Sequence, residues 1–278
     1  MAPVSNLQPT AINGELNAVQ QEAGDHSKKS KAVISETLAE SDYNRQRQEP
    51  KPADAHYLPL ADLRLFLDHF TNETFDQLLD YGCGGSPYRS LFKANRFLRA
   101  DYVDCGDVDC LIAEDGTLPL PEACCDGVLS TQVLEHVFSP QAYLAEAFRV
   151  LRPGGKLMLS THGIWEDHGC PYDFWRWTTD GLTREVERAG FSVTNAYKIT
   201  TGGRAIAFLF SQILPQLRAS RMSLLGLSLT LLRRSAFAVP EKRHIWLDQL
   251  FSGNRLVPAG TEGHGVYLCL GIEAVKTI

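Results

Sequence analysis

The feature that most constrains the fold is a glycine-rich turn that follows a short apolar run. The run 75–80 is typical of a buried strand, and it leads directly into the turn 82–87, Gly-Cys-Gly-Gly-Ser-Pro. Glycines after a buried strand let the backbone turn sharply and approach a ligand closely. Ser86 followed by Pro87 is typical of a helix start, whose free N–H groups would point at that ligand. The pattern predicts a doubly wound nucleotide-binding sheet.

Strand-like and helix-like segments alternate through most of the chain. Strands are expected at 75–80, 97–103, 111–113, 127–131, 156–161, 191–197 and 266–275. Helices are expected at 60–70, from Ser86, from Ser139 to about Leu151 before Pro153-Gly154-Gly155, and at 179–189. This alternation predicts an α/β fold, a doubly wound, seven-stranded and mostly parallel sheet. Residues 200–264 are apolar and helical in pattern, which indicates a helical insertion or cap before the last strand.

Composition divides the chain into two parts. Residues 1–54 are rich in Gln, Asn, Glu, Ser and Lys, so this leader buries too little apolar surface to offset its ordering entropy. We expect it to be mostly disordered, and we assign residues 55–278 to one folded domain. Segment 205–232 contains two apolar stretches, 205–214 and 224–232, which Arg218 and Arg221 separate, and neither reaches the ~20 apolar residues of a membrane span. Two interpretations stay open for it: a helical cap over the site, or a peripheral contact with a membrane surface.

Charge and cysteine usage exclude several classes of function. The formal net charge of −6 disfavours a nucleic-acid partner bound through its phosphates. Seven cysteines are present without the spacing of a zinc site or a disulfide framework. We therefore expect reduced thiols, a cytoplasmic location and no metal.

Acidic residues at successive strand ends narrow the choice of cofactor. A dinucleotide fingerprint needs a third glycine where Pro87 stands, and a P-loop needs a lysine that the turn lacks. Asp80 lies two residues before Gly82, where a carboxylate suits a ligand with an ammonium group and repels pyrophosphate. Asp101 ends the second strand, where an acid can bind ribose hydroxyls. Asp115 follows the third strand, where it can accept a hydrogen bond from an adenine amino group.

The segment from Asp80 to Phe191 resembles the class I S-adenosylmethionine-dependent methyltransferases of the type 11 group. The matching pieces are LLDYGCGGSPY, EDGTLPLPEACCDGVLSTQVLEHV and AEAFRVLRPGGKLMLS. The resemblance implies contacts to the methionine end, the ribose and the adenine of S-adenosyl-L-methionine. It assigns Asp80, Gly82 and Gly84 to the methionine end, Asp101 to the ribose, and Asp115 with Gly116 to the adenine. Gln132, in the segment after the fourth strand, is implied to line the cofactor near its sulfonium.

Candidates for proton transfer gather after the fourth and fifth strands. They are His136, His162 and His168, with Glu135. His162 directly follows the fifth strand on the expected acceptor side, and we select it with His136 as catalytic residues, although either can be a packing or hydrogen-bonding histidine.

The loop 162–178 is unusually rich in aromatic and charged residues. We expect it to contact the acceptor through Asp173, Trp175 and Arg176; the alternative is that Asp173 and Arg176 form a local ion pair and Trp175 is a core residue. A similar loop in a subset of type 11 proteins suggests a sugar-like or hydroxylated acceptor.

The sequence thus predicts an enzyme that transfers a methyl group to a small-molecule or sugar-like hydroxyl acceptor. Two alternatives stay open. One is methylation of a lipid or quinone-like acceptor at a membrane surface. The other is a cofactor-binding interaction module without catalysis.

Overall fold

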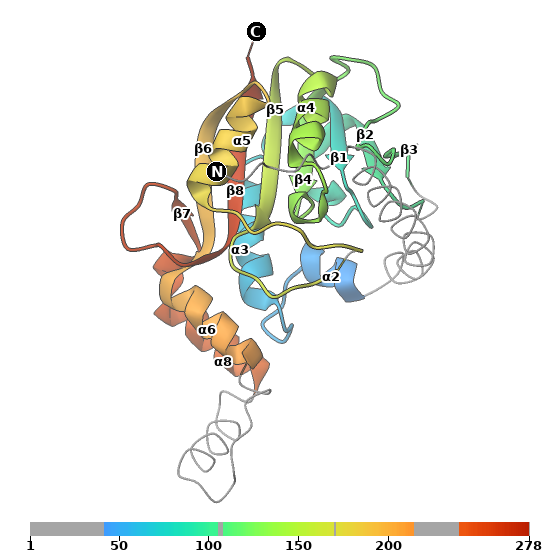
Figure 1. Ribbon diagram of the computed structural model, residues 1–278. Coiled ribbons are helices and arrows are strands. Elements are labelled where there is room, and N and C mark those ends of the chain that lie inside the picture. The colour runs from blue at the N-terminus through green and yellow to red at the C-terminus, as the bar shows by residue number, and fades with distance from the viewer. Residues whose placement is uncertain (1–41, 105–107, 170, 214–238, 278) are drawn as a thin grey trace, which may run out of the picture.

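A central β-sheet organises the computed structural model, which describes residues 42–104, 108–169, 171–213 and 239–277. Among these residues the sheet has eight strands in the order β3-β2-β1-β4-β5-β8-β6-β7 (Figure 1). The strands are β1 (Thr74–Tyr81), β2 (Lys93–Asp101), β3 (Cys110–Leu111), β4 (Cys125–Thr131), β5 (Leu151–His162), β6 (Phe191–Thr201), β7 (Leu256–Pro258) and β8 (Tyr267–Lys276).

The strand directions confirm the predicted doubly wound sheet. Neighbours from β3 to β5 are parallel, whereas β8 runs antiparallel to both β5 and β6. The eighth strand is β7, a short antiparallel edge within the predicted insertion. Strand β1 pairs with β2 on one side and β4 on the other, so the strand order reverses there. Ligands of such sheets bind outside the carboxyl ends of the strands at this reversal.

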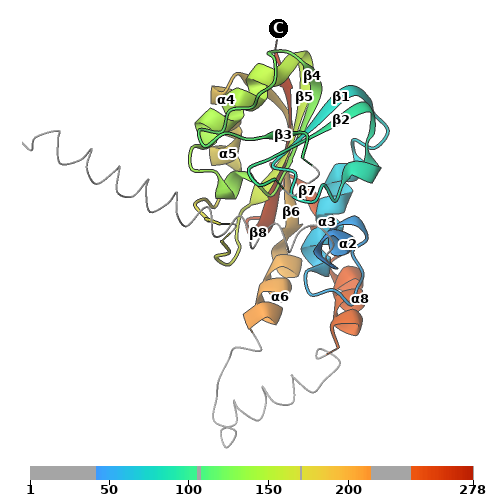
Figure 2. The ribbon, with the colours of Figure 1, turned by 90° about the vertical axis from the view of Figure 1, so that its right-hand side faces the viewer.

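Helices cover both faces of the sheet (Figure 2). They are α2 (Asp42–Gln48), α3 (Tyr57–Asp68), α4 (Pro140–Val150), α5 (Thr179–Arg188), α6 (Gly202–Ile213) and α8 (Pro240–Leu250). One buried cluster joins α4 and α5 to the sheet, and a second joins α3 and α6 to the opposite face. Successive residues of β1 divide between them, Leu78 in one cluster and Leu79 in the other, as the two-residue period of a strand requires.

Of the two helix starts predicted at Ser-Pro pairs, one is confirmed and the other is wrong. Ser139 caps α4, its hydroxyl accepting a hydrogen bond from the N–H of Ala142, so this Ser-Pro start is confirmed. The start predicted at Ser86 is wrong, because no α-helix follows the glycine-rich turn. Ser86 has a φ of 47°, and only a single 3₁₀ turn (Arg89–Leu91) separates it from β2. The backbone returns to β2 too soon to complete an α-helical turn, so the glycine-rich turn does not lead into a helix N-terminus.

The polar leader is ordered near its end. Residues 42–54 contain α2, and the Arg45 guanidinium lies 2.5 Å from the Asp54 carboxylate. Arg64 of α3 also donates a hydrogen bond to the Gln48 carbonyl. The predicted boundary at residue 54 is therefore wrong for this stretch, because specific ion pairs and backbone contacts order a sequence with few apolar residues. Residues 1–41 lie outside the described part of the chain.

The predicted insertion contains helices α6 and α8, which project from one end of the sheet (Figures 1 and 2). Residues 214–232 of segment 205–232 lie outside the described residues. Where the chain is described, none of its helices combines the length and the apolar character of a membrane span.

A buried ionic network ties this insertion to α3. The Asp62 carboxylate contacts Arg204 at 2.6 Å and Arg255 at 2.7 Å, and Arg204 also lies 2.6 Å from Asp248. The side chains of Asp62 and Arg204 are fully buried. Each charge is thus compensated in the interior, where an unpaired charge would be costly.

We expect Asp62→Asn to lower the free energy of unfolding by about 3–5 kcal/mol, because it leaves the buried Arg204 without its fully buried carboxylate partner. Urea denaturation measures this change. Asp68→Asn is the matched control, since Asp68 pairs with Arg64 on the same helix at the surface, and it should cost less than about 1 kcal/mol. Equal losses in the two variants would contradict the assigned role of the network.

Candidate active site at the carboxyl ends of the central strands

The carboxyl ends of β1 and β2 meet in one turn. Gly82 and Cys83 both donate backbone hydrogen bonds to the Ala100 carbonyl. The Gly84 N–H donates to the Asp101 carboxylate at 2.7 Å. The structure therefore brings together the glycines and the strand-end acid that the sequence predicted to share one site.

Gly82 allows this turn to approach the loop that follows β4. Its φ is +80°, and a Cβ at this position would lie 2.6 Å from Cγ1 of Val133. The neighbouring Gln132 has a φ of 55°, so the β4 loop bends sharply at the same place. Any side chain on Gly82 would push the two loops apart. The glycine is thus required by a protein contact as well as by any ligand.

Asp80 is a buried carboxyl at the end of β1. Burial raises its pKa to about 7. The Ser86 hydroxyl is itself buried and has no hydrogen-bond partner among the described residues. A carboxyl that is costly to ionise and an orphaned hydroxyl suit a ligand that brings a positive charge and hydrogen-bonding groups. These residues fit the ammonium end of S-adenosylmethionine.

The other two predicted acids also shape the backbone. Asp101 accepts hydrogen bonds from the N–H groups of Gly84 and Val103. Asp115 is exposed and accepts from the backbone and hydroxyl of Thr117, which lowers the pKa of Asp115. The Gly116 carbonyl accepts from the Tyr81 hydroxyl. The contacts of Asp101 to ribose, and of Asp115 and Gly116 to adenine, stay predictions.

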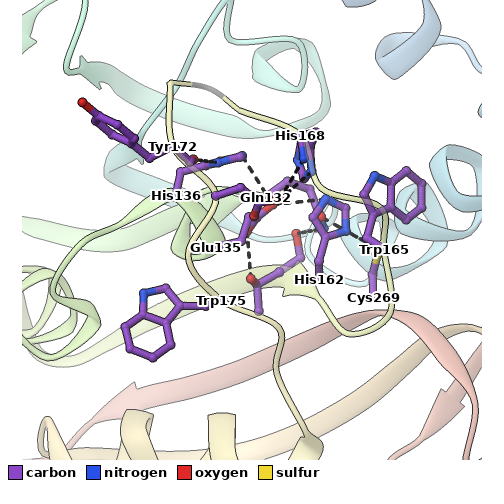
Figure 3. A network of polar contacts seen from close by, with 12 residues as sticks. Gln132, Glu135, His136, His162, Trp165, His168, Tyr172, Trp175 and Cys269 are labelled. Carbon is purple, nitrogen blue, oxygen red and sulfur yellow. Dashed lines mark hydrogen bonds and ion pairs between the residues drawn. The ribbon is translucent and has the colours of Figure 1, made fainter. Parts of the chain in front are cut away.

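A chain of polar contacts leads from the β4 loop to the end of β5. Gln132 donates to the Ser160 hydroxyl at 3.2 Å, and its side-chain oxygen lies 3.8 Å from the Cys269 thiol. The same thiol lies 3.4 Å from Nδ1 of His162. His162 and the predicted cofactor residue Gln132 are therefore separated by a single side chain (Figure 3).

Glu135 is the centre of the acceptor side. Its carboxylate is fully buried, accepts a hydrogen bond from Thr161 at 2.8 Å and lies 3.2 Å from Nε2 of His162. Its backbone carbonyl accepts from the N–H groups of Phe174 and Trp175. Burial raises the pKa of Glu135 to about 7 and lowers the pKa of His162 well below its usual value. Two adjacent groups with shifted pKa values are a recurrent feature of proton-transfer sites.

The two other histidines surround this carboxylate (Figure 3). His136 places Nδ1 2.6 Å from the Tyr172 carbonyl and Nε2 3.9 Å from Glu135. The His168 ring packs edge to face on both His136 and His162, with centroids 4.9 and 5.0 Å apart. Burial lowers the pKa of His136 as well. The structure thus gathers all three candidate histidines around Glu135.

The loop 162–178 is held by the pair that we expected to contact the acceptor. Arg176 and Asp173 form a bidentate ion pair with N–O distances of 2.6 and 2.5 Å, which lowers the pKa of Asp173. Arg176 also donates to the carbonyls of Trp165 and Glu166. The Trp175 indole donates to the Val137 carbonyl, and its side chain is partly exposed rather than a core residue. The alternative of a local ion pair is the arrangement observed, and contact with an acceptor stays a prediction.

An aromatic stack closes the site toward α6. The Trp165 ring stacks on His162 at 4.7 Å and on Phe208 of α6 at 5.4 Å. His56, which precedes α3, lies beside the rings of Trp165 and Phe208. Neither Trp165 nor Phe208 was selected from the sequence, because only the fold stacks Trp165 on His162 and Phe208 on Trp165.

The raised pKa of Asp80 makes a prediction for stability against pH. A carboxyl whose pKa is higher in the folded than in the unfolded state stabilises the fold below the unfolded value, and this contribution is lost as pH rises through about 7. Without cofactor, the stability of the native protein relative to Asp80→Asn should fall by about 3 kcal/mol between pH 4 and 7. Urea denaturation at several pH values measures this difference. Asp180→Asn removes an exposed carboxyl as a control, and an identical profile for both variants would refute the prediction.

Comparisons with known proteins agree with this geometry. Residues 79–159 match the family model of the type 11 methyltransferase domain. A protein of Mycolicibacterium smegmatis described as a probable S-adenosylmethionine-dependent methyltransferase is 36% identical over 91 residues, which cover 31% of this chain and 35% of the relative. The matched part of the chain spans about a third of the length of the curated relatives that it matches.

Two solved structures show the same fold. A chain of the complex that contains the Haloferax volcanii Trm112 methyltransferase activator aligns with a TM-score of 0.50 and 16% identity, over 86% of this chain and 100% of that one. The [4+2]-cyclase SpnF aligns with a TM-score of 0.50 and 15% identity, over 92% and 94%. At such identities the likeness concerns the fold alone. The family match shows that residues 79–159 belong to a methyltransferase domain of the type 11 group, and the surrounding chain has the fold of the class I S-adenosylmethionine-dependent methyltransferases.

Proposed function

We propose that this protein transfers a methyl group from S-adenosylmethionine to a hydroxyl group of a small-molecule or sugar-like acceptor. The observation that carries the proposal is the buried pair of Glu135 and His162 at the carboxyl ends of β4 and β5, 3.2 Å apart. It lies one side chain away from Gln132, on the side expected for the acceptor.

The cofactor supplies a methyl group activated on a positively charged sulfur. The residues of this chain position the two reactants and receive a proton. Asp80 and the turn 82–87 would hold the methionine end of the cofactor, and Gln132 would line its sulfonium next to the acceptor. Because burial keeps His162 neutral, the imidazole can accept the hydroxyl proton, and the neighbouring Glu135 carboxylate then stabilises the imidazolium. Trp165 and Phe208 exclude water from this side of the site.

The test separates cofactor binding from transfer. Calorimetry with S-adenosylhomocysteine measures binding, and transfer of an isotope-labelled methyl group to fractionated small metabolites measures turnover. We expect His162→Phe to lower turnover at least about 100-fold while cofactor affinity stays the same, because it removes the proton acceptor. His69→Phe is the control, since His69 is exposed at the C-terminal end of α3 and packs on Tyr197.

Three outcomes of this test are informative. Labelled products that resist mild base and carry the methyl on oxygen support an ether-forming transfer to a hydroxyl. Equal turnover of His162→Phe and His69→Phe would refute the role of His162. Cofactor binding without transfer to any fraction would favour a non-catalytic module or another reaction, as the likeness to a [4+2]-cyclase illustrates that the fold does not determine the chemistry.

A second candidate is methylation of a lipid or quinone-like acceptor at a membrane surface. It is favoured by large apolar side chains exposed on the projecting helices. These are Ile206, Phe210 and Ile213 on α6, and Ile245, Trp246 and Leu250 on α8. An apolar face of this kind can insert at the boundary between headgroups and acyl chains.

Co-sedimentation with anionic phospholipid vesicles tests this candidate. If it is correct, the protein should pellet with vesicles, and replacing Ile206, Phe210 and Ile213 together by Ser should abolish pelleting, because the buried apolar area is lost. Phe138→Ser is the control, because Phe138 is 82% exposed but lies outside α6 and α8. Absence of pelleting by the unmodified protein would leave the small-molecule acceptor as the proposal.

A further inference from the structure

The cluster around Glu135 has the composition of a metal site. One ligand atom from each of Glu135, His136 and His168 lies within 4.8 Å of the other two. His162 adds a third imidazole, whose Nε2 lies 3.2 Å from the Glu135 carboxylate. The three ligand residues come from the 3₁₀ turn after β4 and from the loop after β5 (Figure 3). Two histidines and one carboxylate are a ligand set of catalytic zinc sites, which keep a further position open.

The hydrogen bonds of the two histidines prepare them to coordinate a cation. Nδ1 of His136 faces the Tyr172 carbonyl at 2.6 Å, and Nδ1 of His168 faces the Glu166 carbonyl at 3.2 Å and the Asp173 carboxylate at 3.3 Å. Because these oxygens only accept hydrogen bonds, each Nδ1 carries the proton and each Nε2 keeps its lone pair. Outer contacts of this kind orient nearly all metal-binding histidines.

Glu135 supplies the second, independent observation. Its Oε2 accepts the hydrogen bond from Thr161, whereas its Oε1 is buried and accepts none from any described residue. The same Oε1 is the atom that faces both His136 and His162. A fully buried carboxylate oxygen without a donor calls for a partner that is absent from the protein itself.

We propose that Glu135, His136 and His168 bind a divalent transition-metal ion, with Zn²⁺ as the expected occupant and His162 as a neighbour of the Glu135 carboxylate. The net charge of the site favours a cation, because the closest arginine, Arg176, is already neutralised by its bidentate pair with Asp173.

The geometry needs only a small adjustment to close around the ion. Zinc lies about 2.0–2.1 Å from its ligands, so tetrahedral ligand atoms are about 3.4 Å apart, against the present limit of 4.8 Å. The side chain of Glu135 is fully buried, that of His136 is 15% exposed and that of His168 is 34% exposed. The ion can therefore enter past His168, whose partial exposure leaves its ring room to move inward.

A metal here would act on the acceptor. This consequence rests on the proposed function, because it places the open coordination position beside His162 at the carboxyl ends of β4 and β5. An acceptor hydroxyl bound to the ion would lose its proton more readily, since a divalent cation stabilises the alkoxide. The absence of a metal was expected from the spacing of the cysteines. The ligands proposed here are two histidines and a carboxylate, which cysteine spacing does not reveal.

The experiment measures metal binding without cofactor or acceptor. The full-length protein is stripped with a chelator and titrated with Co²⁺, whose visible absorption reports coordination by protein ligands, and elemental analysis counts Zn²⁺ in the untreated protein. We expect one tightly bound equivalent and displacement of Co²⁺ by Zn²⁺. His168→Ala should weaken Co²⁺ binding at least about 100-fold, because it removes a direct ligand. His69→Ala is the matched control and should bind like the unmodified protein.

Separate outcomes support or overturn each step. Weak, non-stoichiometric Co²⁺ binding, or equal binding by His168→Ala and His69→Ala, would overturn the site. His168→Gln replaces His168→Ala if circular dichroism shows that the latter is unfolded. Tight binding with turnover unaffected by chelation would overturn the role in acceptor activation, while leaving both the metal site and the proposed methyl transfer intact.

Discussion

The burial of the Glu135 carboxylate is the constraint on which the arrangement of the acceptor side depends. A carboxylate without water must be compensated by donors, by cations or by a proton. Its side chain contacts Thr161 and His162 at the end of β5, and its backbone carbonyl receives two N–H groups of the loop 162–178. One residue therefore joins the β4 loop, the β5 end and the aromatic loop into a single unit.

The cofactor side depends on a different contact, the close approach of two loops at Gly82. The turn after β1 and the bend after β4 meet where β1 separates the two halves of the sheet. Because Val133 occupies the space that a Cβ would need, the glycine keeps the predicted methionine-binding turn beside Gln132. The contact through Cys269 then connects this turn to His162, so the cofactor and acceptor sides form one continuous site.

Several features could be predicted from the sequence because their signals are local. The strand–turn pattern around Asp80, the alternation of elements and the Ser139 cap each depend on a few neighbouring residues, and all three are present. The helix expected at Ser86 is absent. The Ser-Pro signal is local, whereas the short return from β1 to β2 depends on how these two strands pair in the sheet. The order of residues 42–54 depends on ion pairs and backbone contacts that composition does not reveal.

The sequence by itself determined the resemblance to the type 11 methyltransferases, the sheet and the strand-end residues predicted to hold S-adenosylmethionine, because motifs of this kind combine residue type with short spacing. Only the tertiary structure decided what surrounds them. It paired Asp173 with Arg176 as a clamp of the loop, stacked Trp165 between His162 and Phe208, and brought His136 and His168 close to Glu135. These groups lie on separate elements, and their distances depend on how the sheet and the loops pack rather than on their separation in the chain.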